Sequence, residues 1–97
     1  MSIFERFFKA ASEVGGETVV SAEELYRLAE SNPVVDEELV SFQSRVGELK
    51  EQAAVGGGLT PADRALIEKY ARESAGALSG YGIGVSTEAF LAVAYEA

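Results

Sequence analysis

The side chains that most often carry out catalysis are scarce in this sequence. It contains neither histidine nor cysteine, which removes the commonest general base, the thiolate nucleophile and the thiolate metal ligand. Its only lysines, Lys9, Lys50 and Lys69, each fall on the predicted polar side of a helix. No serine lies in a Gly-x-Ser-x-Gly nucleophile motif. The sequence therefore predicts a protein that is not an enzyme, with no catalytic residues and no cofactor.

Acidic residues gather at two predicted helix starts, Glu23-Glu24 and Asp36-Glu37-Glu38. Acids in the first turn stabilise a helix because they face the positive end of its dipole. Adjacent helix positions point in different directions and no second set of ligands is evident, so no metal site or paired-carboxylate site is predicted. The alternative interpretation is that these five acids form a contact surface for a basic partner.

Two glycine-rich stretches do not match nucleotide-binding motifs. Gly56-Gly57-Gly58 lacks the Gly-Lys-Ser/Thr ending of a phosphate-binding loop and follows no strand, so it predicts a loop or a flexible hinge. Residues 80–85 alternate glycine with large residues, but the third glycine is misplaced for the dinucleotide fingerprint. We expect a close-packed turn in which Tyr81, Ile83 and Val85 fill gaps, with an anion-binding nest of backbone amides as the alternative.

The chain carries a net charge of −8, and residues 21–58 contribute −5 of it, from eight acidic and three basic residues. Such a surface repels phosphate backbones and anionic lipid, so no direct binding of nucleic acid is predicted. Solubility is the simplest explanation, and a basic protein partner is the alternative. No stretch reaches the roughly 20 apolar residues of a membrane span, and no signal peptide is recognisable. A cytoplasmic location, or one within a macromolecular assembly, is expected.

An apolar pattern of helical spacing runs through the middle of the chain. Its residues are separated by steps of four, three, four, three and four, which is typical of a heptad seam and not of a strand. A seam this narrow must pack against another helix, either in the same chain or in another copy. Gly47 inside this helix suggests close approach of another backbone, and the alternative is a glycine that the helix merely tolerates. The seam residues are Val35, Leu39, Phe42, Val46, Leu49 and Ala53.

These patterns predict an all-α fold in a single domain over residues 1–97. It is a small bundle of about five helices with short glycine-rich connections and one long central helix, for which Asn32 and Asp36 are alternative N-caps. Residues 17–20 are expected to form an extended connector. The predicted helices are 2–14, 22–31, 34–54, 61–78 and 87–96. The predicted core consists of Phe4, Phe7, Leu25, Leu28, Leu39, Phe42, Val46, Leu49, Leu66, Tyr70 and Phe90.

The predicted apolar faces exceed what one small bundle covers. They are the phenylalanine-rich stripe of residues 2–14, which is either core or interface, the heptad seam and the apolar C-terminal helix. This excess predicts a non-enzymatic structural or accessory protein that self-assembles or joins a larger assembly, for instance a virion such as a phage particle. The predicted interface residues are Phe4, Phe7, Phe8, Leu39, Phe42, Val46 and Leu49.

The acidic middle of the chain supports a different hypothesis. In this alternative the protein is a small inhibitor or adaptor that imitates a nucleic acid and binds a basic protein surface. The residues that would form its acidic partner surface are Glu23, Glu24, Asp36, Glu37 and Glu38.

Overall fold

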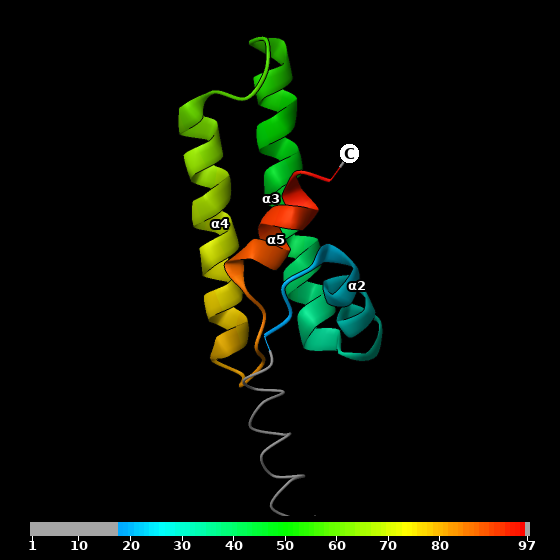
Figure 1. The fold of residues 1–97 in the computed structure, drawn as a ribbon. Coiled ribbons are helices and arrows are strands. Elements are labelled where there is room, and N and C mark those ends of the chain that lie inside the picture. The colour runs from blue at the N-terminus through cyan, green and yellow to red at the C-terminus, as the bar shows by residue number, and fades with distance from the viewer. Residues whose placement is uncertain (1–17, 97) are drawn as a thin grey trace, which may run out of the picture.

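The computed structural model describes residues 18–96, which form four α-helices joined by short connections (Figure 1). The all-α prediction is confirmed for these residues, with four helices there against about five predicted for the whole chain. The predicted helix over 2–14, with Phe4, Phe7 and Phe8, lies outside the described residues. The helices are α2 (Ala22–Ser31), α3 (Pro33–Val55), α4 (Pro61–Ser79) and α5 (Thr87–Ala94).

Helices α3 and α4 run antiparallel as a hairpin, α2 packs at its end farther from the connecting loop, and α5 lies against its middle (Figure 1). The loop reverses the chain with Gly57 and Gly58 at φ values of 103° and 126°. This left-handed region is readily accessible only to glycine. The glycines therefore shape the turn, and their action as a hinge stays a prediction. None of the helices in residues 18–96 is long and apolar enough to cross a membrane.

Each described helix begins at a polar cap that was visible in the sequence. Of the two alternatives for the long helix, Asn32 is the cap, and its side chain accepts hydrogen bonds from the backbone of Val34 and Val35. Thr60 and Asp63 form a reciprocal capping box at the start of α4, with bonds of 2.9 and 3.1 Å. These local bonds satisfy amides that lack partners within the helix, and they fix where each helix begins. The remaining caps are Ser21 for α2 and Ser86 for α5.

The core lies where all four described helices meet. The rings of Phe42 on α3 and Phe90 on α5 are both fully buried and pack edge to face, with their centroids 5.0 Å apart. Five predicted core residues are confirmed as buried: Leu25, Leu39, Phe42, Val46 and Phe90. Three others, Leu28, Leu49 and Tyr70, are only partly buried.

The prediction of Leu66 as a core residue is wrong, because its side chain is 37% exposed. The inward face of α4 belongs to Ile67, Ala71 and Leu78, all of which are fully buried. Neighbouring helix residues point about 100° apart, so Leu66 is turned away from the core by its position beside Ile67. An apolar side chain is thereby left at the surface of the hairpin.

Two glycine-based predictions also need correction. A Cβ atom added to Gly47 would meet nothing within 4 Å, so this glycine marks no close backbone approach. In the turn after α4, Tyr81 is 70% exposed and fills no gap, whereas Val85 is buried and Ile83 is partly buried. The turn passes through Gly82 at a φ of 77°, which leaves Tyr81 on the solvent side.

The connector before α2 is extended where it is described. The Val19 amide donates to the Gly84 carbonyl and the Ser86 amide donates to the Val19 carbonyl, both at 2.9 Å. Val19 and Val85 thus form an isolated parallel bridge. The bridge ties the start of the described chain to the connection between α4 and α5, and it places Val85 in the core.

Candidate protein–protein interface

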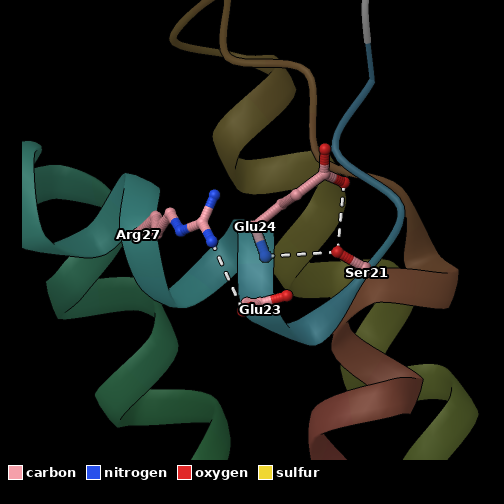
Figure 2. A network of polar contacts seen from close by, with 4 residues as sticks. All are labelled: Ser21, Glu23, Glu24 and Arg27. Atoms are coloured by element: carbon pink, nitrogen blue, oxygen red, sulfur yellow. Dashed lines mark hydrogen bonds and ion pairs between the residues drawn. The ribbon is translucent and has the colours of Figure 1, made fainter.

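The predicted acidic residues of α2 are occupied by local contacts (Figure 2). The Ser21 hydroxyl donates to a Glu24 carboxylate oxygen at 3.1 Å, and the Glu24 amide donates back to that hydroxyl at 3.2 Å. One turn along, Arg27 pairs with Glu23 at 3.3 Å. Both contacts are exposed and are explained by the stability of the helix start, since such surface pairs contribute only tenths of a kcal/mol.

The second acidic group begins in the first turn of α3. Asp36 lies in that turn, and the side chains of Asp36 and Glu37 are exposed while Glu38 is partly buried. In the described part of the chain the side chains of Asp36, Glu37 and Glu38 form no ion pair and no hydrogen bond. Within residues 18–96 no three acidic side chains converge as a metal site would require.

The heptad seam finds its partners within the same chain. Leu39, Phe42 and Val46 are at most 4% exposed, so a second copy has no access to them in this conformation. Burial then declines along the seam toward the loop, where Leu49 and Ala53 are only partly buried. This decline coincides with the part of the hairpin that projects beyond α2 and α5 (Figure 1).

Apolar side chains are consequently exposed near the loop. We refer to residues 49–66 as the hairpin tip. Within the tip Val55 is 91% exposed and Leu66 is 37% exposed, while Leu59 is partly buried. Two helices alone bury only one stripe of each, so the side chains flanking that stripe stay in contact with water.

The register between α3 and α4 is marked by a polar cluster. Arg45 on α3 pairs with Glu73 on α4 at 3.2 Å, and its guanidinium carbon lies 4.6 Å from the centroid of the Tyr70 ring. The ion pair joins residues 28 positions apart, and the cation–π contact adds a second link between α3 and α4. Sequence reasoning missed the cluster. The available signal was the position of Arg45 beside the seam, where heptad helices place charges that meet the neighbouring helix.

The ten side chains around this cluster form a continuous stripe on each helix. On α3 they recur at steps of four, three, four and three, and on α4 at steps of four, three, four and four. Arg45 is partly buried and the other nine are exposed. We call this surface the outer face. It consists of Ser41, Arg45, Glu48, Gln52 and Val55 of α3 and Ala62, Leu66, Lys69, Glu73 and Ala77 of α4.

Helix α5 lies on the other side of the hairpin. It meets α3 at a cavity of about 120 Å³ lined by Gln43 and Lys50, and it meets α4 at an open groove of about 390 Å³ lined by Arg64 and Glu68. Positions two residues away on a helix point about 200° round it. Glu48 of the outer face, two residues before Lys50, therefore points away from α5.

The C-terminal end of α5 is held by polar contacts of its own. The Tyr26 hydroxyl donates to a Glu96 carboxylate oxygen at 2.6 Å, and the Lys50 ammonium donates to the Ala94 carbonyl. The hydrogen bond to Glu96, with partial burial, raises the pKa of the Tyr26 phenol above its usual value of 10.0. In the adjoining groove the Arg64 guanidinium lies 5.5 Å from the Tyr95 ring centroid. These contacts keep α5 on its side of the hairpin.

Comparison of the chain with protein-family models, with curated proteins and with solved structures finds no match.

Proposed function

We propose that the protein acts without catalysis, as a structural or accessory subunit that assembles with further copies of itself through helical surfaces. The observation that carries this proposal is the incomplete burial of the hairpin tip. The heptad seam is buried at Val35, Leu39, Phe42 and Val46, and it is only partly buried at Leu49 and Ala53, nearer the loop. A repeat that continues past its intramolecular partners is suited to a further helical partner.

The energetic reason lies in the apolar side chains of the tip. Burying a valine or leucine completely contributes about 1.5–3 kcal/mol, and Val55 is 91% exposed. Leu66, which also belongs to the hairpin tip, is 37% exposed. In a symmetric assembly each copy buries the same side chains, so the free energy gained by burying one residue is gained once in every copy.

The alternative of an acidic inhibitor has less support from the contacts. Glu23 and Glu24 are occupied by an ion pair and a cap, and Asp36 lies at the helix start, where dipole stabilisation explains it. Glu37 and Glu38 form no ion pair within residues 18–96, and they are the two acids of this surface that its local contacts do not explain. This alternative becomes the leading hypothesis if the protein proves to be monomeric.

The experiment is a measurement of mass in solution by light scattering, over a dilution series at low and high salt. Assembly through apolar side chains predicts a discrete multimer that dissociates on dilution and persists at high salt, because salt does not screen hydrophobic burial. A monomer at every concentration would overturn the proposal.

A further inference from the structure

We infer that the outer face binds the outer face of a second copy, with the two hairpins parallel and their tips at the same end. In this arrangement α3 of each copy lies against α4 of the other. The inference rests on the proposed self-assembly and specifies the surface and the orientation that would perform it. The observations that support it are the order of charges along the two stripes and the exposed apolar side chains of the tip.

The level of each residue along the hairpin follows from the Arg45–Glu73 pair, which joins α3 to α4 at 3.2 Å. Because the helices are antiparallel, each step toward the tip on α3 is matched by a step backward in sequence on α4 (Figure 1). One turn closer to the tip, Glu48 shares its level with Lys69. At the tip itself, Val55 shares its level with Ala62.

A two-fold axis parallel to the helices keeps each residue at the same level in both copies and places α3 of one copy opposite α4 of the other. Glu48 then faces Lys69 of the second copy, and Lys69 faces that copy's Glu48, so each contact forms twice. One turn farther from the tip, Arg45 faces the second copy's Glu73, and at the tip Val55 meets its Ala62. Opposite charges meet at both charged levels, and apolar side chains meet at the tip. The outer face is thus complementary to itself.

The antiparallel alignment does not bring the two tips together. It places α3 against α3 and α4 against α4. When its two-fold axis passes through the level of Glu48 and Lys69, Glu48 faces the second copy's Glu48 and Lys69 faces its Lys69. When the axis passes midway between the two charged levels, Glu48 faces the second copy's Arg45 and Lys69 faces its Glu73, so opposite charges also meet. In both of these antiparallel alignments the apolar side chains of the two tips lie at opposite ends of the contact and do not meet. Contact between the exposed apolar side chains of the two tips therefore selects the parallel alignment, and the charge pairs fix its register.

The side chains involved are free to make these contacts. Glu48 and Lys69 are exposed, and in the described part of the chain neither forms an ion pair. Arg45 and Glu73 are 37% and 49% exposed in their side chains, so a second copy can reach their existing pair. The Nε atom of Arg45 is buried and has no hydrogen-bond partner there.

The test is a set of charge reversals, each measured as a dimer dissociation constant by sedimentation equilibrium. Glu48→Lys and Lys69→Glu each create two like-charge contacts in the parallel dimer, and each is expected to raise the dissociation constant about tenfold or more. The double variant, and an equimolar mixture of the two single variants, restore opposite charges at both contacts. Both are expected to return to the wild-type dissociation constant.

Glu30→Lys serves as the matched control, because Glu30 is an exposed acid on α2, outside the outer face. Helical circular dichroism verifies that every variant is folded. If the wild type dimerises but the single reversals bind as tightly as the control, the outer-face inference fails while self-assembly stands. If the wild type is a monomer at every concentration, the proposed function fails and the inference fails with it.

Discussion

Replacing Ser74 by alanine is expected to stabilise the protein. Ser74 lies inside α4 with a fully buried side chain, and its hydroxyl oxygen has no hydrogen-bond partner within the described residues. Burying a hydroxyl without a partner costs about 1–3 kcal/mol. Alanine removes this cost and gains about 0.5 kcal/mol of helix propensity, while the small void left by the oxygen offsets part of the gain.

We therefore expect Ser74→Ala to raise the free energy of unfolding by about 1–2 kcal/mol. The assay is urea denaturation followed by circular dichroism at a fixed protein concentration, with the slope of the transition compared between variants. Ser44→Ala is the matched control, because Ser44 is an exposed serine inside α3 and reports the propensity term alone. A gain at Ser74 no larger than that of the control, or a loss of stability, would refute the reasoning about the buried hydroxyl.

Three further predictions concern the described helices. Gly47→Ala should raise the urea midpoint, with a gain of about 1 kcal/mol, since the added Cβ has open space inside α3. Leu39→Asp or Val46→Asp should abolish the folded state, seen as loss of helical circular dichroism, because each buries an unpaired charge. The raised Tyr26 pKa predicts a stabilising contribution that is present below pH 10 and lost at higher pH, and Tyr26→Phe should remove that pH dependence from the unfolding midpoint.

Features set by neighbouring residues were readable from the sequence. Caps such as Ser21, Thr60 and Ser86 act within three residues, so their helices begin where a local motif predicts. The heptad spacing likewise predicted that Leu39, Phe42 and Val46 share one buried face. In both cases one segment contains the whole signal.

Features set by packing between segments were not readable in the same way. Leu66 and Ile67 are both apolar, and only the placement of α3 and α5 decides which of them faces inward. The Arg45–Glu73 pair depends on the register of two helices joined by a glycine loop. The outer face is defined by that register, so it emerged only from the structure.

Self-assembly through the outer face is tested by comparing Leu66→Asp with Val40→Asp in sedimentation velocity. Both side chains are exposed apolar residues within helices of the hairpin, but only Leu66 lies on the outer face. The account predicts that Leu66→Asp shifts the protein to a folded monomer, because a charge must then be desolvated in the contact, while Val40→Asp leaves the assembly intact. Equal assembly of the two variants, or loss of assembly only with Val40→Asp, would contradict it.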